Sequence, residues 1–229
     1  MPQRLAEPRP RPLRGLLALG VLATALLARP VSAASLAGIV RDDAGKPVQD
    51  AVVYAIAPAG ARPAAGRAGR EVIDQQDKEF VPRAKPVQVG TPVWFPNKDN
   101  IRHHVYSFSP AKKFELPLYK GTPAAPVLFD KPGVVVLGCN IHDWMLGYVL
   151  VLETPWFATT GPDGAAQLKD LQAGAYEVRV WHPRMPDGEP QRQRVTLATG
   201  KTEAVEFQIA LKPEWRPRRA PTGAGDRYR

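Results

Sequence analysis

Three side chains that bind soft metal ions stand close together in one short segment of the chain. Cys139, His142 and Met145 are spaced as C-x2-H-x2-M within residues 138–147, between two apolar runs. A thiolate favours Cu(I), an imidazole binds both Cu(I) and Cu(II), and a thioether is a weak axial ligand that tunes the reduction potential. The spacing therefore predicts that one loop supplies three ligands of a copper site, which still needs a second imidazole.

His103 or His104 is expected to supply that second imidazole. Both begin a run of strand-forming residues about three dozen positions before Cys139. Adjacent residues of a strand point to opposite faces, so only one of the two can reach the metal. Other interpretations stay open at this point: a zinc site or an inert buried pair for Cys139 and His142, and core packing for Met145.

The first residues predict export. Four arginines between Arg4 and Arg14 precede an apolar run from Leu16 to Ala28, and small residues follow up to Ala34. This order is typical of a secretory signal peptide, residues 1–34, with cleavage near Ala33 or Ala34 and a periplasmic mature protein; an uncleaved anchor is the alternative. An exported protein with a single cysteine cannot form an internal disulfide, so a metal would explain Cys139.

The charge of the chain lies mostly at its ends. Of the formal net charge of +9, residues 1–34 and 212–229 each contribute +4, which leaves +1 for residues 35–211. A nearly neutral folded part offers no electrostatic footprint for nucleic acid. Residues 212–229 are rich in Pro, Arg and Gly, and we expect a disordered basic tail.

Short strand-like runs recur along most of the chain and predict an all-β fold of two sandwiches. Seven such runs lie in residues 71–153, where Lys112–Tyr119 is ambiguous. Leu36–Ala57 is interpreted as one β-hairpin, and Val195–Ile209 is expected to form another across a Thr-Gly-Lys turn. Residues 58–70 are almost entirely Ala, Gly, Pro and Arg, which predicts a flexible linker.

The outer segments resemble a carboxypeptidase regulatory-like (transthyretin-like) β-sandwich. Gly38–Val48 is similar to the opening of that fold, and Thr160–Val178 is similar to its later hairpin. The resemblance implies one small domain split over residues 35–57 and 154–211, with residues 71–153 inserted into it. Two consecutive domains are the alternative.

Residues 71–153 resemble the plastocyanin and amicyanin cupredoxins, which are Greek-key β-sandwiches. Thr91–Asp99 and the His103-His104-Val105 run are similar to the strand and first-histidine motif of that family, and the loop spacing is of the short amicyanin kind. The resemblance implies one copper ion on His103, Cys139, His142 and Met145. His104 stands where the family has an asparagine. The wider pattern resembles exported plastocyanin-like proteins labelled methylamine utilisation proteins.

This resemblance implies a monomeric carrier of single electrons that exchanges them with a c-type cytochrome or a periplasmic dehydrogenase. Copper enzymes that reduce oxygen or nitrite need further histidine clusters, and this chain has four histidines, so we expect no enzyme. Copper delivery and a recognition module with a stabilising metal are the alternatives. Tyr106, Tyr119 and Trp144 are expected to be packing residues, and His182, near Met185, a surface histidine.

Overall fold

The computed structural model describes residues 33–58, 70–186 and 188–214. The predicted signal peptide lies outside this part except for its last two residues, and so do most of the predicted linker and most of the predicted tail. The described residues form 17 strands and no helix, so the all-β prediction is confirmed. No described segment forms a helix long and apolar enough to cross a membrane.

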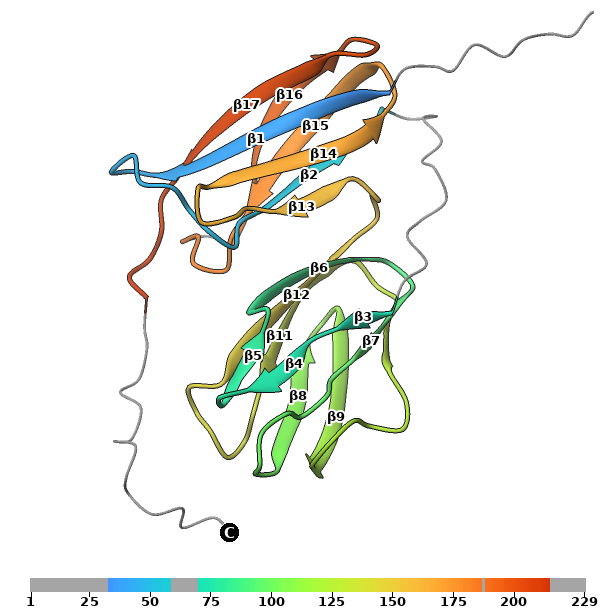
Figure 1. The fold of residues 1–229 in the computed structure, drawn as a ribbon, viewed down its shortest axis with the longest axis vertical. Helices are drawn as coiled ribbons and strands as arrows, with labels where there is room; N and C mark the ends of the chain where they lie inside the picture. Colours follow the sequence, from blue (N-terminus) through green and yellow to red (C-terminus); the bar gives the residue numbers. More distant parts are fainter. Residues whose placement is uncertain (1–32, 59–69, 187, 215–229) are drawn as a thin grey trace, which may run out of the picture. The chain divides into compact units, whose positions relative to one another are not determined.

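One sandwich is formed by the middle of the chain (Figure 1). Its strands are β3 (Glu71–Val72), β4 (Asp74–Gln76), β5 (Glu79–Val81), β6 (Ala84–Gln88), β7 (Thr91–Trp94), β8 (His103–Ser109), β9 (Lys112–Tyr119), β10 (Val127–Phe129), β11 (Gly133–Gly138) and β12 (Leu146–Leu152). A three-stranded sheet has the order β10-β7-β3, a five-stranded sheet has the order β6-β12-β11-β8-β9, and β4 and β5 form a hairpin.

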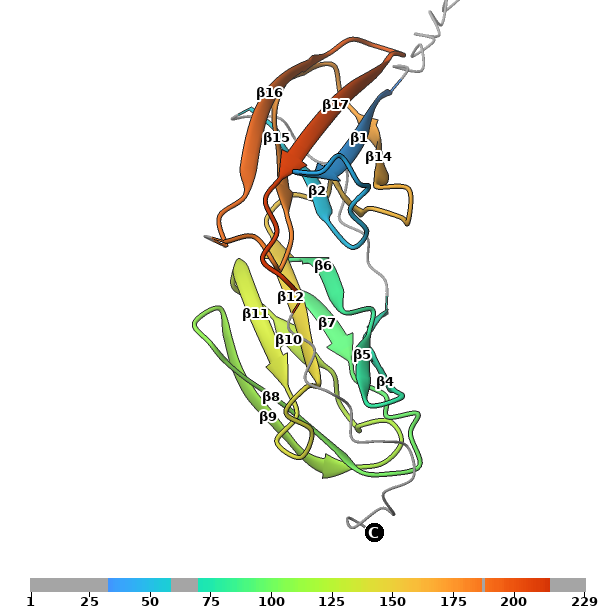
Figure 2. The ribbon, with the colours of Figure 1, turned by 90° about the vertical axis from the view of Figure 1, so that its left-hand side faces the viewer.

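The core of this sandwich fixes the strands that end at the candidate site. Figure 2 shows β8, β9 and β11 running alongside one another. Phe95 directly follows β7 and Phe129 ends β10, both in the smaller sheet. Their ring centroids lie 5.7 and 6.1 Å from that of Phe114 on β9, and 6.5 Å from each other. Buried aromatic rings remove a large apolar area from water, so these contacts hold the two sheets together.

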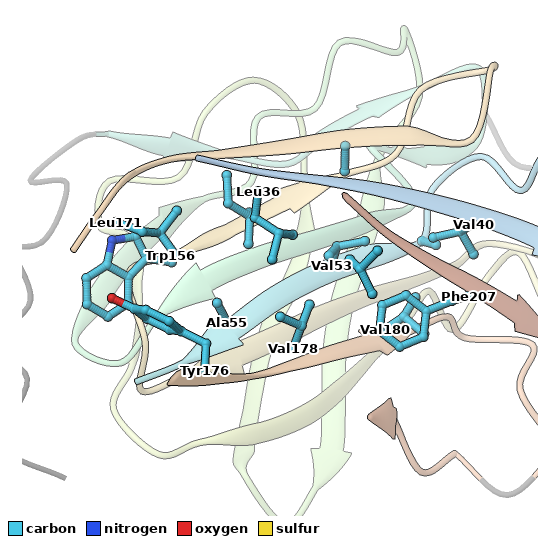
Figure 3. Close-up of a cluster of buried hydrophobic side chains, with 14 of the residues drawn as sticks. Leu36, Val40, Val53, Ala55, Trp156, Leu171, Tyr176, Val178, Val180 and Phe207 are labelled. Carbon is cyan, nitrogen blue, oxygen red and sulfur yellow. The ribbon is translucent and has the colours of Figure 1, made fainter. Parts of the chain in front are cut away.

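A second sandwich combines strands from both sides of the first in the sequence. Its strands are β1 (Ala34–Asp42), β2 (Val52–Ile56), β13 (Phe157–Thr159), β14 (Ala165–Leu171), β15 (Gly174–Trp181), β16 (Gln191–Leu197) and β17 (Thr202–Ile209). The sheets have the orders β14-β1-β17 and β13-β2-β15-β16. Figure 3 shows Leu36 and Phe207 of one sheet and Val53 and Val178 of the other within one buried cluster.

Two predicted hairpins are wrong. β1 pairs with β14 and β17, whereas β2 pairs with β13 and β15, so the two strands of Leu36–Ala57 belong to opposite sheets. β16 pairs with β15 and β17 pairs with β1, so the second expected hairpin is also split between sheets. Alternation shows that one face of a strand is buried, and this pattern is the same for a hairpin and for a connection that crosses between sheets.

Candidate metal centre

Three of the predicted ligands come together at one end of the first sandwich. His103 is the first residue of β8, Cys139 directly follows β11, and His142 lies in the loop before β12. The Cys139 Sγ atom lies 3.9 Å from His103 Nδ1 and 3.7 Å from His142 Nδ1. All three side chains are buried, and their ligand atoms lie within 4.8 Å of one another.

The two neighbouring histidines of β8 turn to opposite faces of the sheet. His103 faces the core, is fully buried and has its ring centroid 4.9 Å from that of His142. His104 points the other way, and its Nε2 atom lies 2.9 Å from a carboxylate oxygen of Glu115 on β9. The alternating direction of side chains along a strand thus places the side chain of His103, and not that of His104, beside the cysteine.

The loop between β11 and β12 places Met145 close to the same centre. The Met145 N–H donates a hydrogen bond to the His142 carbonyl oxygen at 2.9 Å, which closes a tight turn. Met145 is 1% exposed and belongs to the same buried cluster as Cys139. The thioether therefore occupies the interior of the sandwich on the side of the loop.

The donor set fits a copper ion. Two ligands about 2.0 and 2.3 Å from one metal ion, at angles of roughly 110–130°, are about 3.5–3.9 Å apart, and both sulfur–nitrogen distances lie in this range. Both histidines turn the same nitrogen, Nδ1, towards the sulfur. One thiolate and two imidazoles are the strong ligands of blue-copper sites, in which a methionine is the weak axial ligand.

Asp99 determines which nitrogen of His103 is available to bind a metal. An Asp99 carboxylate oxygen lies 2.6 Å from His103 Nε2. Partial burial raises the pKa of Asp99, but hydrogen bonds from His103 and from two backbone N–H groups outweigh it and hold the pKa below its ordinary value. Because the carboxylate is ionised, Nε2 carries the proton and donates it, and Nδ1 is left with a free lone pair.

The same carboxylate also fixes a turn of the β4–β5 hairpin. Asp77 and Lys78 both have positive φ, 55° and 61°, and their N–H groups donate to Asp99 at 2.7 and 2.9 Å. Two such residues in succession make a tight hairpin turn that usually contains glycine. Asp99 thereby ties this turn to the candidate ligand His103.

Asn97 organises the segment that carries Asp99. Its side-chain amide donates to the carbonyl oxygens of Ile101 and Tyr119, each at 2.8 Å, and its side-chain oxygen accepts from the Asp99 N–H at 2.9 Å. Neither Asn97 nor Asp99 is among the residues predicted from the sequence to form the site. The signal that could have found them is the Asn-x-Asp spacing just before the histidines, since both types cap turns with their side chains.

The surroundings of Cys139 favour its ionised form, the thiolate. Burial raises the pKa of the thiol, but the interactions of its sulfur with the two imidazoles, together with hydrogen bonds from the N–H groups of His104 and Ile141, outweigh it and lower the pKa to about 5. The thiolate is the form of cysteine that binds metals. The protein therefore holds Cys139 in its ligand form at neutral pH.

His182 is not the surface histidine that was expected. It is 6% exposed, its backbone N–H donates to the Met185 sulfur at 3.3 Å, and its Nδ1 accepts the Arg184 N–H at 3.1 Å. The turn after β15 folds back on itself and encloses the ring, which the polar sequence around it did not indicate. His182 and Met185 lie in the second sandwich, outside the cluster of Cys139.

No protein-family model and no curated protein matches this chain. Among solved structures, a mutant of amicyanin in its reduced state is 26% identical with a TM-score of 0.34, over 43% of this chain and 99% of the amicyanin. A copper-containing nitrite reductase from Thermus scotoductus SA-01 is 27% identical with a TM-score of 0.35, over 43% of this chain and 27% of that enzyme. The chain is thus similar over part of its length to two kinds of copper protein with the cupredoxin fold.

Proposed function

We propose that this protein binds one copper ion in a type 1 (blue) site and carries single electrons between redox proteins. The observation that supports the proposal most directly is the Cys139 sulfur 3.9 and 3.7 Å from the Nδ1 atoms of two buried histidines. Copper bound there would alternate between Cu(I) and Cu(II) and so accept or give one electron. The proposed ligands are His103, Cys139, His142 and the axial Met145.

The residues around the site have definable roles in that function. The strands and the loop hold the three strong ligand atoms close together, so little rearrangement would be needed when the charge of a bound ion changes. Met145 and Cys139, 1% and 3% exposed, are shielded from water. His142 is 8% exposed, the most accessible of the four, and we propose that electrons pass through its ring.

Electron transfer is favoured over copper delivery by the burial of the ligands. A delivery site must release its ion to another protein, which requires ligands that a competing donor can reach. All three strong ligands are buried here. We propose an exported, periplasmic carrier whose partners are redox proteins such as a c-type cytochrome or a periplasmic dehydrogenase.

Voltammetry of the copper-loaded protein, combined with a competing Cu(I) chelator, tests the proposal. A carrier gives a reversible one-electron wave and retains its copper in the presence of the chelator. An irreversible wave together with rapid loss of Cu(I) to the chelator would reject the carrier and support delivery. A Cys139→Ala variant controls for copper bound elsewhere on the chain.

A further inference from the structure

A buried glutamine and a tyrosine converge on one backbone carbonyl of residues 95–98, the segment that follows β7. Gln75 of β4 is 0% exposed, and its Nε2 atom donates to the Phe95 carbonyl oxygen at 3.1 Å and to the Tyr119 hydroxyl oxygen at 2.5 Å. The Tyr119 hydroxyl donates to the same Phe95 oxygen at 2.5 Å. A carbonyl oxygen can only accept, so it is the amide nitrogen of Gln75 that faces it.

The backbone of Gln75 binds the rest of this segment. Its N–H group donates to the Pro96 carbonyl oxygen at 2.8 Å, and its carbonyl oxygen accepts the N–H of Lys98 at 2.8 Å. Gln75 and Asn97 thus form an isolated parallel bridge. The Asn97 side chain, in turn, donates to the Tyr119 carbonyl oxygen at 2.8 Å. Gln75 and Tyr119 therefore hold the segment through main-chain and side-chain bonds together.

The segment leads directly to Asp99, which orients the candidate ligand His103. The Asp99 N–H donates to the Asn97 side-chain oxygen at 2.9 Å, and the Asp99 carboxylate lies 2.6 Å from His103 Nε2. The place of this carboxylate therefore depends on the residues that Gln75 and Tyr119 hold. Neither of these two side chains is a candidate ligand.

The hydroxyl of Tyr119 keeps its proton in this setting. Burial raises the pKa of Tyr119, and the negative charge of the Cys139 thiolate raises it further, whereas the hydrogen bond from Gln75 lowers it by less. The hydroxyl can therefore donate to Phe95, and its removal changes no charge. Tyr119 was expected to be a packing residue, and it is also part of a polar network.

We propose that Gln75 and Tyr119 are positioning residues of the copper site. They fix residues 95–98, these residues fix Asp99, and Asp99 fixes the direction in which His103 Nδ1 faces the ion. His103 would then keep one orientation in both oxidation states, which limits the rearrangement that accompanies each electron. This inference rests on the proposed copper function and extends it to the residues that keep the site rigid.

The metal-free protein gives the first test, by NMR of nitrogen-15-labelled imidazole groups. The Nε2 proton of His103 is held by Asp99, so its exchange with solvent should be slow in the wild type. Tyr119→Phe removes one hydroxyl, and Gln75→Met removes the amide and keeps the length of the side chain. Each substitution should speed this exchange several-fold, because the carboxylate is no longer held in place.

The copper-loaded protein gives the second test. A looser contact between Asp99 and His103 makes the imidazole a weaker electron donor, which favours Cu(I). Both variants should therefore raise the reduction potential, in the same direction as Asp99→Asn, and should slow electron self-exchange several-fold. In an Asp99→Asn background they should shift the potential no further, because they act through that carboxylate. Voltammetry and NMR line broadening measure the two quantities.

Tyr148→Phe is the matched control. It removes the hydroxyl of a half-buried tyrosine on β12 of the same sandwich. Within the described residues, that hydroxyl makes no hydrogen bond to residues 95–99 or to a candidate ligand. Proton exchange, reduction potential and self-exchange should therefore stay at their wild-type values.

Unchanged proton exchange and an unchanged potential in Tyr119→Phe and Gln75→Met would overturn the proposal, even if both variants are less stable, because the network would then only support the fold. Full additivity with Asp99→Asn would also overturn it. If Gln75→Met does not fold, Tyr119→Phe, which removes a single oxygen atom, decides the question. A wild type without a reversible potential would reject the copper function, whereas the exchange of the His103 proton would still test the positioning. The two failures are therefore distinguishable.

Discussion

At the scale of single residues, the candidate site depends on which nitrogen of His103 is free. The bond between Asp99 and His103 Nε2, 2.6 Å long, fixes the tautomer that turns Nδ1 towards Cys139. The negative charge of Asp99 also makes the imidazole a stronger electron donor, which stabilises Cu(II) more than Cu(I). Affinity and reduction potential should therefore both respond to Asp99, although its side chain is not a ligand.

We predict that Asp99→Asn lowers the affinity for Cu(II) by about 10- to 100-fold and raises the reduction potential. Isothermal titration with Cu(II) and voltammetry measure the two effects. Asp143→Asn is the matched control, because Asp143 is an exposed carboxylate next to His142 that makes no hydrogen bond to a candidate ligand within the described residues. Equal effects of both substitutions would show that general charge, and not the bond to His103, is responsible.

The residues of the site were predictable to different degrees. Cys139 and His142 were selected because the loop spacing is local. Strand alternation allows only one of His103 and His104 to reach them, and the resemblance to the cupredoxin motif selected His103.

Asp99 was missed because the Asn-x-Asp spacing before the histidines indicates a capped turn but does not say which side chain the carboxylate contacts. The buried position of His182 was missed because it depends on the turn after β15, in which Arg184 and Met185 hydrogen-bond with His182.

At the scale of the elements, the turn before β14 is the most tightly constrained. Gly164 has a φ of +75°, and a Cβ atom there would lie 2.5 Å from the Val40 carbonyl oxygen of β1. Gly45 has a similar φ of +77°, but nothing lies within 4 Å of its Cβ position. Substituting Gly45 therefore measures the cost of the backbone conformation alone, whereas substituting Gly164 adds the cost of a steric clash.

We predict that Gly45→Ala lowers the free energy of unfolding by about 1 kcal/mol, the cost of a left-handed backbone for alanine. Gly164→Ala should lower it by at least about 2 kcal/mol more, because β1 and the turn must move apart. Chemical denaturation followed by circular dichroism measures both. Equal losses would show that the contact with Val40 relaxes without cost.

Strand positions were largely predictable, whereas strand partners were not. The runs around His104, Val134 and Tyr148 predicted β8, β11 and β12, since β-branched and aromatic residues alternate there. The β4–β5 hairpin was not predicted, because its residues are mostly polar. The pairing of β1 with β17 joins residues more than 160 positions apart, as the bond between Arg41 and Glu206 illustrates, and no local signal specifies such a contact.

At the scale of the whole molecule, His182 should make folding stability depend on pH. Burial, together with the positive charge of Arg184, lowers the pKa of His182 from 6.5 to about 4. Between these values the unfolded chain binds a proton that the folded protein does not bind. The stability is therefore complete above pH 6.5 and is lost progressively as the pH falls towards 4.

We predict that His182→Gln removes part of this loss. The decrease in the free energy of unfolding of the metal-free protein from pH 7 to pH 4.5 should be about 1–3 kcal/mol smaller in the variant than in the wild type. Other titrating groups are the same in both proteins and cancel in the difference. Parallel pH profiles would show that the His182 ring is solvated in the folded state.

The division of the chain into two sandwiches was also predictable from the sequence. Two segments on either side of residues 71–153 form one sandwich. They were expected to belong together because neither alone would cover an apolar face and because both resemble parts of one carboxypeptidase regulatory-like sandwich. This arrangement connects the metal-binding sandwich to the rest of the chain at two points, before β3 and after β12. The boundaries at 57, 70 and 153, the signal peptide and the basic tail stay predictions.

In the proposed site, Cys139 binds copper as a thiolate together with two histidines. The most direct measurement is the visible absorption spectrum of the mature protein after addition of Cu(II), for the wild type and for Cys139→Ser. We predict an intense blue charge-transfer band in the wild type and none in the variant, which lacks the sulfur. A colourless wild type, or a band that persists in Cys139→Ser, would contradict the copper–thiolate site.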